Sequence, residues 1–222
     1  GSLNTFLNAF TYPDKTCYPV ASQNLQDLYN LIDVYMDAVL HPLLSPQTLQ
    51  QEGWHYELDE LEAPLTYKGV VFNEMKGAYS DPDNLLYKTV QESVFPDNVY
   101  ALDSGGDPTV LPELTYTQFK NFHERYYHPS NALIYFYGDD DPAERLRKMD
   151  GYLQEFTPIQ PAPAITLQPH FTEPRKVTAL FDAGDDSDAN SKKAMLTVNF
   201  LLEDSRQIQT SLGMAILAHI LI

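Results

Sequence analysis

The feature that most constrains this chain is one carboxylate set among apolar residues, within the stretch 67–81. If residues 70–80 form a helix, one face carries Val70, Val71, Glu74, Gly77 and Ala78, which are the i, i+1, i+4, i+7 and i+8 positions. An ionised carboxylate that loses its water costs several kcal/mol unless a cation, a metal or several hydrogen-bond donors compensate it. The pattern therefore predicts either a Glu74 that reaches solvent at the edge of the stripe or a Glu74 with a partner distant in sequence.

Local signals predict a hairpin followed by several helices. Residues 3–10 and 17–22 are β-prone runs on either side of a turn that contains Pro13-Asp14. Asn24 can cap a helix whose apolar residues keep a 3.6-residue period up to a stop at His41-Pro42. Further helices are expected over 82–93, 115–126, 142–156 and 205–222, and apolar strands over 132–137, 176–181 and 194–202.

Prolines and the last residues suggest how the chain is divided. Five prolines fall between residues 157 and 174, a composition typical of a linker. The last predicted helix ends in the apolar run 216–222 with no C-cap, so its final carbonyl groups would lack partners. We therefore expect a second unit after the linker, and expect it to be incomplete.

The charge balance limits the classes of partner. The chain has 14 Lys and Arg against 31 Asp and Glu, which gives a formal net charge of −17. Such a chain repels phosphate backbones and anionic membrane surfaces and attracts basic ligands, so we expect no nucleic acid and no membrane among its partners. The sequence has no run of 18 apolar residues, and its single cysteine, Cys17, excludes an internal disulfide.

The residues alone reveal no complete catalytic motif. None of the six histidines has another histidine four residues away, as two metal ligands on one helix turn would. His123 and His128 are therefore interpreted as surface or packing residues. The acidic loop 182–190 resembles a calcium loop in composition, but Lys193 occupies the position of the bidentate Glu, so we interpret the loop as solvated. Glu74 remains the one chemically informative side chain.

Five blocks of sequence are distinctive: GSLNTFLNAFT at 1–11, QEGW at 51–54, YKGVVFNEMKG at 67–77, DSGGDP at 103–108 and YHPSNA at 127–132. In this order they resemble the presequence protease branch of the pitrilysin/insulysin (M16) zinc metallopeptidases. The resemblance covers the chain from its first residue to its last.

The resemblance implies an α+β fold, in which helices pack on an antiparallel sheet, inside a closed chamber of four homologous domains in two halves. It implies a zinc endopeptidase that degrades short, unstructured peptides such as targeting presequences. Family members bind zinc through an inverted His-x-x-Glu-His motif and a distal Glu, and Glu74 matches that distal metal ligand. Asn8, Ala9 and Phe10 match the edge strand on which the family lays its substrate. A zinc ion would compensate the charge of Glu74.

The chain departs from the family because it contains no inverted motif, which relatives carry upstream of the Asn-Ala-Phe strand. A catalytic zinc requires three protein ligands, so we expect an inactive fragment, with no catalytic residue of its own, of an active parent. Its parts would be 1–156, most of the first peptidase domain; 157–170, the linker; and 171–222, the truncated opening of a second domain. Its expected partners are short basic peptides and the C-terminal half of its own chain. Relatives occur in the mitochondrial matrix, the plastid stroma and the bacterial cytoplasm.

Two other interpretations stay open. The parent can be a non-catalytic peptide-binding or assembly subunit of the same family, in which case the upstream motif would be degenerate. Alternatively, the chain is a complete acidic interaction domain, which leaves its uncapped apolar end unexplained.

Overall fold

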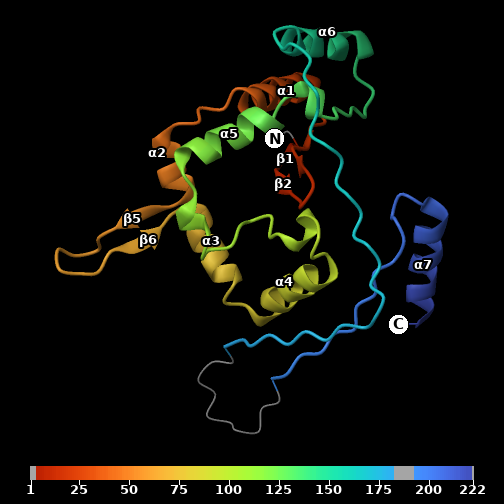
Figure 1. The fold of residues 1–222 in the computed structure, drawn as a ribbon. Coiled ribbons are helices and arrows are strands. Elements are labelled where there is room, and N and C mark those ends of the chain that lie inside the picture. Colours follow the sequence, from red (N-terminus) through yellow and green to blue (C-terminus); the bar gives the residue numbers. More distant parts are fainter. Residues whose placement is uncertain (1–3, 183–192, 222) are drawn as a thin grey trace. The chain divides into compact units, whose positions relative to one another are not determined.

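The computed structural model describes residues 4–182 and 193–221, and it is an α+β structure of helices and short antiparallel strand pairs (Figure 1). Two compact units are present. The first comprises Gly1–Gly77 with Ser104–Ala164, and the second comprises Ala78–Asp103 with Ile165–Ile222. Residues 78–103 thus belong with the C-terminal part of the chain, whereas the division at 156 and 171 stays a prediction.

The N-terminal strands form one continuous hairpin. Strands β1 (Phe6–Leu7) and β4 (Val20–Ala21) pair antiparallel, as do β2 (Phe10–Thr11) and β3 (Thr16–Cys17), and both pairs share one register. The ladder is interrupted at Pro19, which accepts a hydrogen bond from Asn8 N at 3.2 Å but has no N–H to return. The turn closes through Tyr12 N and Lys15 O at 2.8 Å. The predicted hairpin is confirmed.

Helices α1 (Leu25–Leu40) and α5 (Tyr116–Tyr126) begin and end where local signals place them. The Asn24 side chain accepts from Asp27 N at 3.0 Å, and α1 ends at His41, before a proline. Thr115 and Gln118 form a reciprocal capping box at the start of α5. The two helices lie next to each other (Figure 1), since His123 Nε2 of α5 bonds Val39 O of α1 at 2.8 Å.

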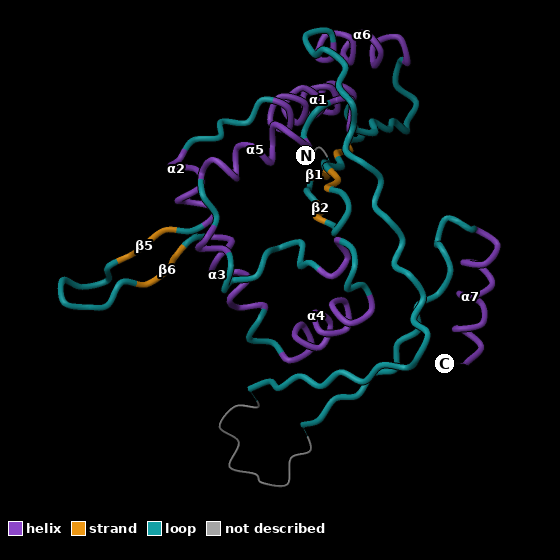
Figure 2. Tube along the Cα trace, in the orientation of Figure 1, coloured by secondary structure: helices purple, strands orange, loops and turns teal. Residues whose placement is uncertain are grey.

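Between these helices the chain forms a short helix, a π-helical turn, a second hairpin and α3. Their bounds are α2 Pro46–Thr48, the π-helical turn Leu49–Gly53, β5 His55–Glu57, β6 Thr66–Lys68 and α3 Val70–Ala78 (Figure 2). Three-residue 3-10 turns occur at Val99–Ala101, Leu111–Glu113 and Pro129–Asn131. The predicted helix at 70–80 is confirmed.

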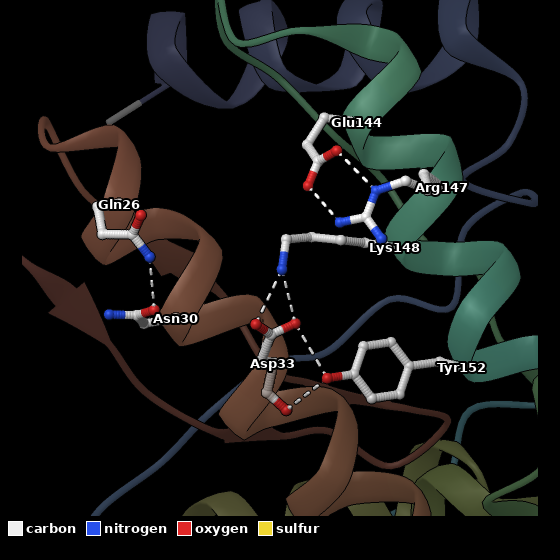
Figure 3. Close-up of polar contacts among 7 residues, drawn as sticks. All are labelled: Gln26, Asn30, Asp33, Glu144, Arg147, Lys148 and Tyr152. Atoms are coloured by element: carbon white, nitrogen blue, oxygen red, sulfur yellow. Dashed lines mark hydrogen bonds and ion pairs between the residues drawn. The ribbon is translucent and has the colours of Figure 1, made fainter.

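Helix α6 (Pro142–Leu153) is held on α1 by a group of polar contacts. Lys148 Nζ donates to both carboxylate oxygens of Asp33 at 2.9 and 2.8 Å, and Tyr152 Oη donates to Asp33 Oδ1 at 3.0 Å (Figure 3). Arg147 pairs with Glu144 on the same helix (Figure 3). Met149 of α6 is buried. The contacts of Lys148 and Tyr152 with Asp33 therefore join α6 to α1.

The second unit contains α4 (Pro82–Val94) and α7 (Ile208–Leu221). Helix α4 begins at Pro82 as predicted, and Asp81 caps it. Gln168 is the buried polar residue of this unit: its Oε1 accepts from Asp97 N at 3.0 Å, and its Nε2 donates to Asp97 Oδ2 at 2.6 Å. This pair fastens the extended chain around Gln168 to the end of α4.

The predicted strands at 132–137, 176–181 and 194–202 are wrong for the part of the chain that the structure describes. All three segments lack strand pairing there. Composition makes a segment β-prone, but a strand also needs a neighbour that accepts and donates its backbone hydrogen bonds, and these segments have none among the described residues. Helix α6 also ends at Leu153 rather than at 156.

Buried apolar side chains are few in the described residues: Ile32, Phe72, Leu111 and Met149. None of the helices described is long and apolar enough to cross a membrane. Cys17 is a free thiol. Residues 183–190 of the predicted acidic loop lie outside the described residues.

Candidate functional site

The first hairpin presents one unpaired edge. In an antiparallel ladder, residues alternate between bonding to the partner strand and pointing their backbone groups away from it. Asn8 and Tyr12 donate to the partner strand, so Leu7, Ala9 and Thr11 direct their N–H and C=O groups to the outer edge. Within the described residues, each sheet has two strands, and no third strand joins this edge. The predicted substrate-binding residues Asn8, Ala9 and Phe10 therefore lie on an open edge.

The Asn8 side chain partly occupies that edge. Its Oδ1 accepts from the Ala9 N–H at 2.8 Å, which is a position that the carbonyl group of an added strand would take. The outward N–H is thus satisfied locally while no strand is bound. Phe10 lies on the face opposite Ala9 and is 41% exposed.

A cavity of about 590 Å³ lies behind Ala9, between the hairpin, α1 and α5. Ala9 and Tyr18 face each other across the ladder and line one side of it. The rest of the lining is mostly apolar and comes largely from the two helices, including Val34, Val39, Phe119 and Phe122. The structure thus brings Ala9 together with side chains more than 100 residues away.

Polar contacts at the cavity wall join the hairpin to α5. The Tyr18 and Tyr127 hydroxyls are 3.0 Å apart, and burial together with this hydrogen bond raises the pKa of Tyr18 well above its usual range. The His123 ring stacks on Tyr127 with centroids 4.7 Å apart. His123 Nε2 must carry a proton because the carbonyl oxygen of Val39 only accepts. His123 is a packing residue, as the sequence predicts.

His128 and His55 are likewise engaged in structural contacts. His128 Nδ1 accepts from Ser130 N at 3.1 Å, and its ring packs edge-on against Phe156. His55 lies between Gln50 O and the Glu57 carboxylate. Over residues 4–182 and 193–221, no three His, Cys, Asp or Glu side chains converge into a group able to hold a metal ion.

Glu74 lies on α3 with its side chain exposed. Of the two alternatives that the sequence left open, the structure shows the one in which the Glu74 side chain reaches solvent. The covered face of α3 carries Phe72, whose ring lies 5.8 Å from that of Tyr67, whereas Val70, on the expected stripe, is 54% exposed. A stripe is buried only where another element covers it. Glu74 can offer one oxygen ligand, but the described residues do not form a complete zinc site.

Sequence reasoning missed the residues that position α3. Gly69 directly precedes the helix with φ of +147°, and a Cβ there would lie 2.2 Å from Gly53 O. Trp54, beside this contact, donates from Nε1 to Leu114 O at 3.0 Å. Gly53 and Gly69, which flank the second hairpin, are the sequence feature that could have indicated this contact, since glycine is favoured where backbones approach closely.

Comparison with known proteins places the chain in a class. Residues 113–222 match the family described as "Peptidase M16 inactive domain". The chain belongs to the M16 peptidase family. The α+β fold agrees with that assignment.

Within this family, the chain is similar over its whole length to presequence proteases. It is 53% identical to "Presequence protease 1, chloroplastic/mitochondrial" of Arabidopsis thaliana and 39% identical to "Presequence protease, mitochondrial" of Mus musculus. It is also 45% identical to "Protein HypA" of Clostridium perfringens. Each match covers 100% of this chain and 21%, 22% and 23% of the respective relatives. The chain thus spans about a fifth of the length of the curated relatives it matches.

Proposed function

We propose that this chain forms part of a zinc metalloendopeptidase that degrades short, unstructured peptides such as targeting presequences. The observation that carries the proposal is the similarity of the whole chain to presequence proteases of plants and animals. In this proposal Glu74 supplies one zinc ligand, and the other ligands come from outside the described residues. Zinc would supply an activated water molecule when bound.

The contribution of the described residues is peptide binding. An extended peptide can add to the outer edge of Leu7, Ala9 and Thr11 through backbone hydrogen bonds, which do not depend on its side chains. The peptide carbonyl group displaces Asn8 Oδ1 from the Ala9 N–H, so an existing hydrogen bond is exchanged for another. This mode suits unstructured substrates, because a folded peptide has its backbone groups already paired.

Charge supports basic peptides as the preferred substrates. The formal net charge of −17 attracts cationic ligands over a distance set by the Debye length, about 8–10 Å near physiological salt. The relatives named "mitochondrial" and "chloroplastic/mitochondrial" suggest those compartments for this protein too.

A second candidate function is a non-catalytic peptide-binding or assembly subunit. It is favoured by the family description of residues 113–222, which calls that domain inactive. Under this alternative the edge at Ala9 still binds peptide, but Glu74 is only an exposed surface carboxylate.

The test compares the natural full-length protein with its Glu74→Gln variant. If Glu74 is a zinc ligand, the variant loses most of its bound zinc, measured by mass spectrometry, and most of its cleavage of a basic unstructured peptide. Glu124→Gln is the matched control, since Glu124 lies on the surface of α5 and pairs only with Lys120 among the described residues. Retention of zinc by Glu74→Gln would reject the ligand role. If the natural protein binds the peptide but does not bind zinc and does not cleave the peptide, it is the non-catalytic subunit.

A further inference from the structure

The second hairpin has one apolar face that the described residues leave uncovered. The register pairs Tyr56 with Tyr67, and the same register continued by one step pairs Leu58 with Leu65. Side chains two residues apart on a strand share a face, so these four residues form one ladder. Their exposed fractions are 58%, 41%, 46% and 64%, and Leu61 at the tip is 96% exposed. We name this surface the hairpin ladder.

The hairpin ladder is held rigidly at its base. The rings of Tyr56 and Tyr67 lie 5.1 Å apart, and Trp54 packs edge-on against both at 5.6 and 5.9 Å. The pKa of Tyr67 is raised, chiefly by its side-chain hydrogen bond with Tyr56. Trp54 is in turn bonded to Leu114 O. The ladder is therefore preorganised, which lowers the entropy that a partner must remove on binding.

The opposite face and the tip are acidic. Glu57 and Asp59 share Lys68, with N–O distances of 3.3 Å to each. Glu60 and Glu62 at the exposed tip form no ion pair within the described residues. The segment 57–65 thus carries four carboxylates and no basic residue beside its exposed leucines.

We propose that the hairpin ladder is a docking surface for a cationic amphipathic peptide segment. Apolar side chains of the peptide would cover Tyr56, Leu58 and Leu65, while its Lys or Arg residues meet the Glu60 and Glu62 carboxylates at the tip. Charge decides between possible occupants: a second copy of this chain would bring another net charge of −17 and place two acidic tips together, which like-charge repulsion opposes. The surface is distinct from the Ala9 edge and requires neither zinc nor cleavage.

The proposal is tested by binding to the 222-residue chain. The probe is a short peptide without tryptophan, in which leucines form one helical face and arginines the other. Trp54 is the single tryptophan and lies at the base of the ladder, so its fluorescence reports docking at this site. We expect a blue shift that saturates with peptide, and a Kd that rises with salt. The same peptide with glutamate in place of arginine should not bind.

Variants of the hairpin ladder test whether the peptide binds at this surface. Leu58→Ser combined with Leu65→Ser should weaken binding by about tenfold or more, since burial of a leucine side chain contributes strongly to affinity. Glu60→Gln combined with Glu62→Gln should weaken it by about two- to fivefold at low salt. The matched control is Leu43→Ser combined with Leu146→Ser, which removes leucines that are 91% and 71% exposed elsewhere and should change Kd by less than about twofold.

Three results would overturn the proposal. The first is unchanged binding by the Leu58 and Leu65 double variant, and the second is equal binding of the arginine and glutamate peptides. The third is a dimer in sedimentation experiments that the same double variant abolishes, which would make the ladder an interface between copies. Because the readout is binding alone, failure here leaves the zinc peptidase proposal standing, and failure of that proposal leaves this one standing.

Discussion

At the scale of single residues, Gly69 is the position where substitution should cost most. Its φ of +147° strains any residue with a Cβ, and the added atom would lie 2.2 Å from Gly53 O and 2.8 Å from Trp54 Cα. Backbone atoms on both sides leave no flexible side chain to move aside. We expect Gly69→Ala to lower the free energy of unfolding by about 2–5 kcal/mol, because the added Cβ causes both backbone strain and overpacking. Urea denaturation followed by Trp54 fluorescence measures this.

Gly77 provides the matched control on α3. Its added Cβ would meet nothing within 4 Å, and its backbone is helical. Gly77→Ala should therefore stabilise the protein by about 0.5–1 kcal/mol, as alanine does in an exposed helix. Equal destabilisation by both substitutions would show that the close approach at Gly69 does not hold α3 in place.

Residues that act locally could be predicted from the sequence, and residues that act through distant contacts could not. Asn24 caps α1 as predicted and α5 forms within the predicted range 115–126, since a cap bonds backbone groups two or three positions away. For Glu74 the sequence left burial and exposure both open, because the pattern shows which residues share a face, not which face is covered. The Tyr18–Tyr127 bond joins residues 109 positions apart, and no local pattern marks it.

At the scale of elements, the attachment of α6 to α1 depends on Lys148. The side chain of Lys148 is 13% exposed and that of Asp33 is 42% exposed, so solvent partly screens the pair. Lys148→Met keeps the aliphatic stem but removes both charge-assisted hydrogen bonds. We expect a loss of about 1–2 kcal/mol, and faster hydrogen exchange in α6 amides than in α1 amides.

Arg147→Met is the comparison, because Arg147 is 70% exposed and pairs with Glu144 of its own helix. Such a pair contributes little, so the change should stay below about 0.5 kcal/mol and leave exchange in α6 unaltered. If the two variants weaken α6 equally, the contact with Asp33 is not what fastens the helix.

Helices were predicted better than strands for a physical reason. A helix satisfies its own backbone, so α1, α4 and α5 could be located from caps and periodicity alone. Strand 132–137 was predicted from composition, yet Leu133 and Tyr137 are 95% and 91% exposed and the segment is unpaired among the described residues. The first hairpin was predicted because a short turn, closed between Tyr12 and Lys15, brings its strands together. The second hairpin, whose strands β5 and β6 are joined by a longer loop, was not predicted.

At the scale of the whole molecule, the two proposals give the chain two kinds of peptide surface. As proposed, the edge at Ala9 recognises the peptide backbone, whereas the hairpin ladder recognises apolar and basic side chains. The same net charge of −17 serves both, since it raises the local concentration of cationic peptides and opposes self-association. Peptide recognition and zinc chemistry therefore depend on different parts of the protein. The described residues carry features suited to peptide recognition, whereas Glu74 can supply only one ligand for zinc.

This separation leads to a prediction for the 222-residue chain by itself. A catalytic zinc needs three protein ligands, and over the described residues no such group converges around Glu74 or elsewhere. We expect the chain to lose zinc to a competing chelator and to leave a basic unstructured peptide uncleaved, as judged by mass spectrometry, while still binding that peptide. The full-length protein assayed in parallel should hold zinc and cleave. Cleavage by the chain alone that a chelator abolishes would contradict the prediction and would require a complete metal site within these 222 residues.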